Sequence, residues 1–299
     1  MPRTSFEALL EAGAHFGHLK RKWNPNIAPY VFGEKNGIHI IDLNKTLAQL
    51  EDAANALKQI AKSGRTVLFV ATKKQAKHII SEAIRDINMP CVTERWTGGM
   101  LTNFATIRRS VRKMSDMNKM ATDGTLDTLS KKEKLQLSRQ RDKLQHQLGT
   151  IANMTRLPAA VFVVDISKEH IAISEARKLN IPTFAIVDTN SNPNMVDFAI
   201  PANDDSSISI RIIVDTLVKA IKEGQEERKE AQVMNKQQVD DKKEEEEIKT
   251  ESKEETVETA ADTTTEEETN TDIPTEFGNA GKAPKEKKNF PRKPYKATK

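Results

Sequence analysis

Apolar residues in the first 224 positions follow two patterns that indicate alternating strands and helices. Continuous apolar runs, typical of strands buried on both faces of a parallel sheet, occupy Thr66–Ala71, Ala159–Val164 and Thr183–Val187. Shorter segments with strand character are Gly37–Asp42, Cys91–Thr93 and Phe198–Pro201. Apolar residues at helical spacing predict helices over Thr46–Lys62, Lys74–Ile87, Glu169–Leu179 and Ser206–Lys222. This alternation predicts a doubly wound α/β sheet.

Residues 104–150 interrupt the alternation with a different pattern. Apolar side chains recur at steps of three, four and seven along two stretches, which predicts two helices joined by a turn at Asp123–Gly124. The apolar seam comprises Ile107, Val111, Met114 and Met117, and then Leu137, Leu144, Leu148 and Ile151. Ser130 and Glu133 have the spacing of a capping box at the start of the second helix. We predict an inserted α-helical coiled-coil hairpin about 25 Å long.

Charge and apolar content both change near residue 225. Residues 1–224 hold 32 Lys and Arg against 23 Asp and Glu, so the overall charge of +4 hides a basic part of +9. The remainder divides into an acidic segment, 225–278, of −12 and a basic segment, 279–299, of +7. Because this remainder is poor in apolar residues, it cannot offset its ordering entropy by burial. We predict an α/β body (1–103 and 151–224), the inserted hairpin (104–150) and a disordered charged tail (225–299).

Composition and motifs exclude several classes of protein. The single cysteine, Cys91, cannot form an internal disulfide, which fits a reducing compartment, and in a predicted strand it is a buried apolar residue rather than a nucleophile. No run of 18 apolar residues and no hydrophobic leader is present, so we expect a cytoplasmic protein that does not cross a membrane. The first strand–helix turn lacks a Gly-rich phosphate loop, which argues against catalysis. The basic first part indicates a polyanionic partner.

Three lysines, Lys73, Lys74 and Lys77, lie at the start of the helix that follows the first apolar run. In a parallel sheet, ligands gather beyond the carboxyl ends of the strands. Lysines at the N-terminus of a helix oppose its dipole, so they indicate an external anion such as phosphate. The alternative interpretation is a solvated cationic surface.

A second candidate segment leads into the hairpin. Arg95 and Trp96 can pair with phosphate or stack on unpaired bases, although Trp96 could instead pack a hinge beside Gly98 and Gly99. On the following helix, basic side chains share one face: Arg108, Arg109, Arg112 and Lys113. Like charges so placed fit a track for a polyanion, and they also fit an ordinary solvated face.

A third candidate segment is basic and aromatic. It places ionic and stacking groups in succession at Lys20, Arg21, Lys22 and Trp23, as expected for a surface that binds RNA. A divalent metal ion could also bind nearby if the fold brings together His15, His18, Asp188, Asp204 and Asp205. Hydrogen-bonded loop residues and Asx turns are the alternative interpretation of the same side chains.

Six segments that occur in a fixed order contain many of these candidates. They are GAHFGHLKRKWNPNIAPYVF, NGIHIIDLNKT, LFVATKKQA, RWTGGMLTNF, FVVDISKEHIAISEARKLNIPTFAIVDTN and IPANDD. The set resembles successive signature segments of the bacterial family of small-subunit ribosomal protein two, over residues 6 to about 222. The resemblance implies a flavodoxin-like α/β/α body with an inserted helical hairpin.

The same resemblance implies a structural role in translation, bound to the ribosome, with no catalysis and no cofactor. Members of the family bind 16S ribosomal RNA at the junction of head and body and help recruit neighbouring proteins, including the large messenger-binding ribosomal protein one. We therefore expect no free homo-oligomer. Candidates for RNA contact by motif position are Lys20, Arg21, Trp23, Lys73, Lys74, Arg95, Trp96, Arg108 and Arg109.

Two other functions remain open from the residues alone. A nucleotide-binding enzyme on the same sheet predicts stoichiometric binding of a free nucleotide. A protein-binding scaffold that uses the hairpin seam predicts no salt-sensitive association with RNA. In the tail, the basic–aromatic segment Phe290–Tyr295 could become ordered on RNA or on a partner.

Overall fold

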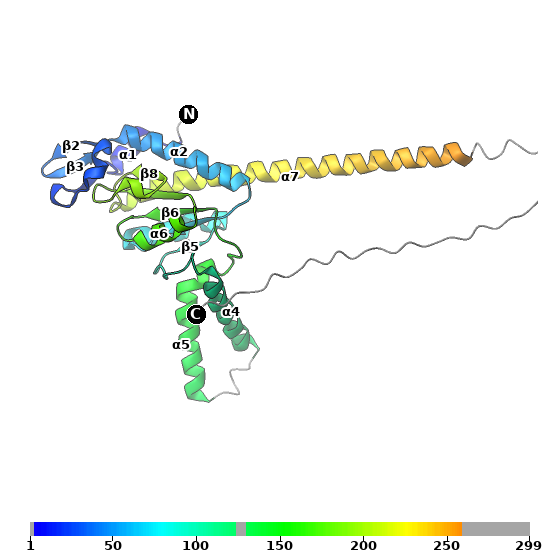
Figure 1. Cartoon of the computed structure of the whole chain (residues 1–299), viewed down its shortest axis with the longest axis horizontal. Helices are drawn as coiled ribbons and strands as arrows, with labels where there is room; N and C mark the ends of the chain where they lie inside the picture. The colour runs from blue at the N-terminus through cyan, green and yellow to red at the C-terminus, as the bar shows by residue number, and fades with distance from the viewer. Residues whose placement is uncertain (1–2, 124–129, 259–299) are drawn as a thin grey trace, which may run out of the picture. The chain divides into compact units, whose positions relative to one another are not determined.

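The computed structural model describes residues 3–123 and 130–258 (Figure 1). The chain divides into two compact units, Met1–Asp240 and Asp241–Lys299. Every strand and helix other than the last part of helix α7 lies in the first unit. The predicted turn at Gly124 and the tail segment 259–299, with Phe290–Tyr295, lie outside the described residues.

A parallel sheet of five strands forms the centre of the first unit, as the apolar runs predict. Its strands are β4 (Val67–Val70), β5 (Cys91–Val92), β6 (Ala160–Val164), β7 (Thr183–Val187) and β8 (Phe198–Pro201). Their order is β5-β4-β6-β7-β8, and every neighbouring pair is parallel. Numbered within this sheet alone, the order is 2-1-3-4-5, that of flavodoxin-like sheets. The predicted α/β class is confirmed.

Helices cover both faces of this sheet. They are α2 (Leu43–Lys62), α3 (Lys74–Ala83), α6 (His170–Lys178) and α7 (Ser207–Glu258), with short 3₁₀ turns η3 (Arg85–Ile87) and η6 (Pro193–Met195). Side chains alternate between two apolar clusters, because successive strand residues point to opposite faces. Phe69 and Phe162 pack with α2, α3 and α7, whereas Leu68 and Val163 pack with α6.

Helix α7 extends well past the predicted end at Lys222, so the predicted tail begins with a helix. Two features of the contact with α2 account for this. Gly224 lets the two helices approach, since a Cβ there would lie 2.4 Å from the carbonyl oxygen of Lys58. Lys58 also pairs with Glu227, at 2.7 Å.

No helix among the described residues is long and apolar enough to cross a membrane.

The predicted insertion forms two helices, α4 (Phe104–Thr122) and α5 (Lys131–Leu148), which lie side by side in Figure 1. The capping box of Ser130 and Glu133 is confirmed. Met114 and Met117 are buried, as expected for seam residues. At the base of the pair, Ile107, Leu148 and Ile151, the last in the 3₁₀ turn η5 (Gly149–Ile151), join the apolar cluster on the α6 face of the sheet.

A second, antiparallel sheet near the N-terminus was not predicted in full. Only β3 (Ile38–Ile41) matches a predicted strand, and it lies between β1 (Phe16–Leu19) and β2 (Val31–Lys35). Both outer strands are largely solvent-exposed, so neither carries an apolar run. Around them lie helix α1 (Phe6–Glu11) and the 3₁₀ turns η1 (Lys20–Lys22) and η2 (Pro25–Tyr30).

Candidate nucleic-acid interface

Lys73 lies at the carboxyl end of β4, as predicted, but its charge is used within the protein. Its Nζ lies 2.8 Å from Asp204 Oδ1, 2.6 Å from Asp205 Oδ1 and 3.8 Å from Asp165 Oδ2. Only 13% of the side chain is exposed. Lys73 therefore neutralises the protein's own carboxylates instead of presenting a free cation to RNA.

His18, from strand β1, reaches the same edge of the parallel sheet. Its Nδ1 lies 2.8 Å from Asp188 Oδ2, and this hydrogen bond raises the pKa of His18. Asp204 is fully buried, and its Oδ2 has no hydrogen-bond partner among the described residues. Burial, with the nearby Asp188 carboxylate, raises the pKa of Asp204 to about 7. One ligand atom each of His18, Asp188 and Asp204 lies within 4.8 Å of the others, close enough to share a cation.

The other two predicted metal ligands lie differently. Asp205 is at the rim, with its Oδ2 3.5 Å from His18 Nε2 and just over half of its side chain exposed. His15 is not brought to this group: its ring lies tilted against that of Phe16, at 4.0 Å between centroids, and lines a hollow beside helix α1. The expectation that His15 joins the group is wrong, because strand β1 starts just after it and carries only His18 to the parallel sheet.

Trp96 is an internal residue, in agreement with the hinge alternative. It is 7% exposed, and its Nε1 donates to Glu175 Oε1 at 3.2 Å. The same buried carboxylate accepts hydrogen bonds from the backbone nitrogens of Gly99, Leu101 and Thr102, at 2.7, 2.9 and 3.1 Å. Although burial alone would raise the pKa of Glu175, these hydrogen bonds outweigh it and lower the pKa. Glu175 thus anchors the segment that leads into α4.

Sequence reasoning missed Glu175. It lies within the predicted helix Glu169–Leu179, three residues after the apolar Ala172, and therefore on the inward face. That position was the available signal, because a carboxylate on an apolar helix face requires buried donors. The donors come from a loop more than 70 residues earlier in the chain, which local pattern cannot show.

The third candidate segment is exposed at its three cations. Lys20, Arg21 and Lys22 form the turn η1 on the surface, and Lys20 Nζ lies 2.8 Å from Glu34. Trp23 is half-buried, with its ring 4.8 Å from that of His39. This segment therefore offers charge to a partner more readily than it offers a stacking surface.

The start of helix α4 presents free cations. Arg109, Arg112 and Lys113 are exposed, and none of them has an ion-pair partner within 3–123 and 130–258. Arg108 is half-buried, and its guanidinium donates a hydrogen bond to the carbonyl oxygen of Thr155. This bond links α4 to the segment that follows the hairpin.

The remaining predicted cations divide in the same way. Lys74 and Arg95 are exposed, whereas Lys77 Nζ lies 2.8 Å from Glu94 Oε2 and is half-buried. The candidates that stay exposed to a polyanion are therefore Lys20, Arg21, Lys22, Lys74, Arg95, Arg109, Arg112 and Lys113, of which Lys20 also pairs with Glu34.

Known proteins match most of the chain. The model of the family described as Ribosomal protein S2 matches residues 9–224. A protein of Phocaeicola vulgatus named small ribosomal subunit protein uS2 is 63% identical over 233 residues, which cover 78% of this chain and 84% of the relative. Relatives of the same name from Bacteroides thetaiotaomicron and Porphyromonas gingivalis are 62% and 61% identical, each over 77% of this chain and 82% of the relative. The chain belongs to the ribosomal protein S2 family.

Proposed function

We propose that the chain is a structural constituent of the small ribosomal subunit that binds 16S ribosomal RNA at the junction of head and body. The observation that carries this proposal is the family match over residues 9–224, which includes both the α/β body and the inserted hairpin. The family is structural, so the chain is not an enzyme. Its place of action is the cytoplasm, bound to the ribosome.

The exposed cations supply the affinity for RNA in this proposal. Each Lys or Arg that neutralises a phosphate releases bound counterions, so association weakens as salt rises. The contacts fall to the eight available cations named above, from Lys20 to Lys113. Lys73, Trp96 and Arg108 act indirectly, since each fixes a segment that carries such a cation. The coiled-coil seam of the hairpin holds α4 in position.

Sedimentation tests the proposal directly. The tagged full chain, expressed in its own cells, is expected to travel with small subunits in a sucrose gradient of the lysate. Raising the salt is expected to release it progressively, because the contacts are ionic. A chain that stays at the top of the gradient at every salt concentration contradicts the proposal.

Neighbouring proteins are the second kind of partner, and we propose that the large messenger-binding ribosomal protein is one of them. An exposed apolar surface near the N-terminus supports a protein contact. Phe6, Leu10 and Phe32 line a hollow of about 160 Å³, and Phe32 is 80% exposed. Exposed apolar patches of this kind mark protein-binding sites.

Replacing Phe32 by Ala is expected to lower the amount of that protein retained on purified subunits about tenfold, because a buried aromatic contact contributes about 1.5–3 kcal/mol. Quantitative mass spectrometry of the subunits measures the retention. The matched control is Leu179→Ala, which removes an exposed apolar side chain from the end of α6. Equal losses in both variants would argue against this surface.

We also propose that His18, Asp188 and Asp204 hold a divalent metal ion such as Zn²⁺. The unpartnered, fully buried Oδ2 of Asp204 supports this, because a buried carboxylate oxygen without a donor is costly unless a cation meets it. One imidazole and carboxylate oxygens form a common ligand set for zinc. Asp205, at the rim, lies 3.5 Å from His18 and offers a further carboxylate.

The metal proposal predicts one equivalent of zinc in the purified full chain after dialysis against a zinc buffer, and loss of that zinc in Asp204→Asn. Zinc at a hundred times its dissociation constant is expected to stabilise the wild type by about 2.7 kcal/mol. Elemental analysis and thermal unfolding measure the two effects. The control is Asp215→Asn, an exposed carboxylate on α7. A wild-type chain without zinc, or equal zinc in both variants, defeats the proposal.

A further inference from the structure

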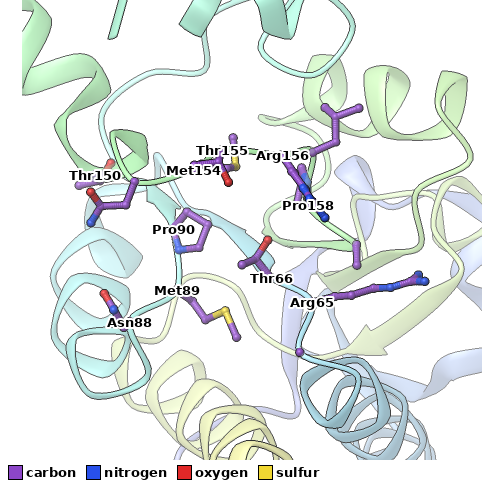
Figure 2. A pocket seen from close by; sticks show the side chains of 14 residues that line it. Arg65, Thr66, Asn88, Met89, Pro90, Thr150, Met154, Thr155, Arg156 and Pro158 are labelled. Atoms are coloured by element: carbon purple, nitrogen blue, oxygen red, sulfur yellow. The ribbon is translucent and has the colours of Figure 1, made fainter. Parts of the chain in front are cut away.

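A hollow of about 620 Å³ opens at the amino ends of the parallel strands, opposite the cluster around Lys73. Figure 2 shows the three segments that form it: Arg65 and Thr66 before β4, Asn88 to Pro90 before β5, and Thr150 to Pro158 after the hairpin. The hollow therefore lies where the hairpin returns to the body. Its volume is in the range of about 300–1,000 Å³ usual for small-ligand sites.

A second hollow, of about 470 Å³, adjoins the first. The two share Arg65, Pro158 and Ala159, and the second continues past Asn180 to the start of β7. We call the two together the amino-edge groove. It runs past the amino ends of neighbouring strands in the same sheet. Its shape therefore suits an extended ligand better than a compact one.

The charge of the amino-edge groove is entirely positive. Arg65 and Arg156 are its charged lining residues, and no carboxylate of the described residues lines either hollow. Both arginines are exposed, and neither has an ion-pair partner in the described part of the chain. An arginine without a partner is free to bind phosphate through two parallel hydrogen bonds.

At the opposite edge of the sheet, carboxylates and cations pair with one another. Asp188 pairs there with His18, and Asp165, Asp204 and Asp205 pair with Lys73. At the amino edge, by contrast, no described carboxylate pairs with Arg65 or Arg156, so both arginines are available to a polyanion.

The uncharged lining fits a nucleotide. Met89, Pro90 and Met154 form an apolar wall against which a base can lie. The side-chain amides of Asn88 and Asn153 have no hydrogen-bond partner in the described structure, so they can meet the polar edge of a base. Proteins that bind single-stranded RNA combine contact with the face of a base and hydrogen bonds to its edge.

We propose that the amino-edge groove binds a short single-stranded segment of RNA, with phosphates at Arg65 and Arg156 and a base against Met89, Pro90 and Met154. This rests on the proposed function and adds to it a surface outside the predicted cations. The hairpin and the groove meet at Thr150 to Arg156, so one RNA segment can contact both.

The test uses the full chain and small subunits from which it has been washed. Binding is measured by sedimentation over a KCl series, for the wild type and for Arg65→Gln/Arg156→Gln. Loss of two single-strand phosphate contacts is expected to make the slope of log K against log salt less steep by about 1.4. The charge-matched control, Lys35→Gln/Lys219→Gln, removes two exposed cations outside the groove and is expected to leave the slope unchanged.

A second measurement does not depend on any variant. Ultraviolet cross-linking of the wild-type chain within subunits, followed by mass spectrometry, is expected to find a nucleotide on the peptides that contain Met89 or Met154. The proposal for the groove is overturned if the chain binds subunits but the salt slope of the double variant is unchanged. It is also overturned if those peptides cross-link to protein and not to RNA. Failure of the wild type to bind at any salt concentration instead overturns the proposed function, and the groove with it.

Discussion

Replacing Arg109, Arg112 and Lys113 together by Gln is expected to weaken association with the small subunit about a hundredfold at 0.15 M salt. These cations are exposed on α4, and no carboxylate among the described residues pairs with them and competes with phosphate. Each duplex phosphate contact contributes about 0.9 to the slope of log K against log salt. At 0.15 M salt, three contacts therefore contribute about two log units to log K. This contribution falls to zero at about 1 M salt.

The measurement is sedimentation of the full chain with washed subunits between 0.1 and roughly 0.5 M KCl, over which counterion release dominates. The slope is expected to become less steep by about 2.7 in the triple variant. Its control removes three exposed cations elsewhere: Lys35→Gln, Lys178→Gln and Lys219→Gln. If the control loses as much affinity as the triple variant, the effect is one of net charge and the assignment to α4 fails.

Replacing Glu175 by Ala is expected to lower the free energy of unfolding by about 4 kcal/mol, since removal of one partner from a buried charged network typically costs about 3–5 kcal/mol. The carboxylate meets Trp96, Gly99, Leu101 and Thr102, and its loss leaves their donors without an acceptor. Chemical denaturation of the full chain measures the change. Glu82→Ala, which removes an exposed pair with Arg211, is the control, with an expected cost below about 1 kcal/mol.

The pH dependence separates the charge of Glu175 from its packing. Because the pKa of Glu175 is lowered in the folded chain, its stabilising effect is complete above the unfolded pKa of about 4.3 and is lost as the pH falls through the folded pKa. The stability difference between wild type and Glu175→Gln is therefore expected to shrink below about pH 4. A difference that stays constant down to pH 3 would mean that the ionised carboxylate is not what holds the loop.

The predicted parts that the structure confirms are those with strong local signals. The runs at Val67–Val70, Ala160–Val164 and Thr183–Val187 form strands because both of their faces are buried. The hairpin helices follow from their own seam and from the capping box at Ser130. Strands β1 and β2 were missed because exposed edge strands carry no apolar run.

The predicted site residues divide according to what surrounds them. Arg109 and Lys74 remain free cations, as a basic sequence implies, because no carboxylate of the described residues pairs with them. Lys73 and Trp96 have the residue types of RNA contacts, but Asp204 and Glu175 engage them. Those partners lie 131 and 79 positions away in the sequence, so no local pattern links them.

By itself, the sequence determined the order of strands and helices, the inserted hairpin, the excess of cations in the first 224 residues and the family resemblance. These depend on residue type and on spacing within one element, which can be read along the chain. Only the tertiary structure decided which cations remain free, that Asp204 lies close to His18, and that Arg65 and Arg156 line one groove. Each of these depends on contacts between side chains from distant segments. The net charge of +4 contains no information about such contacts.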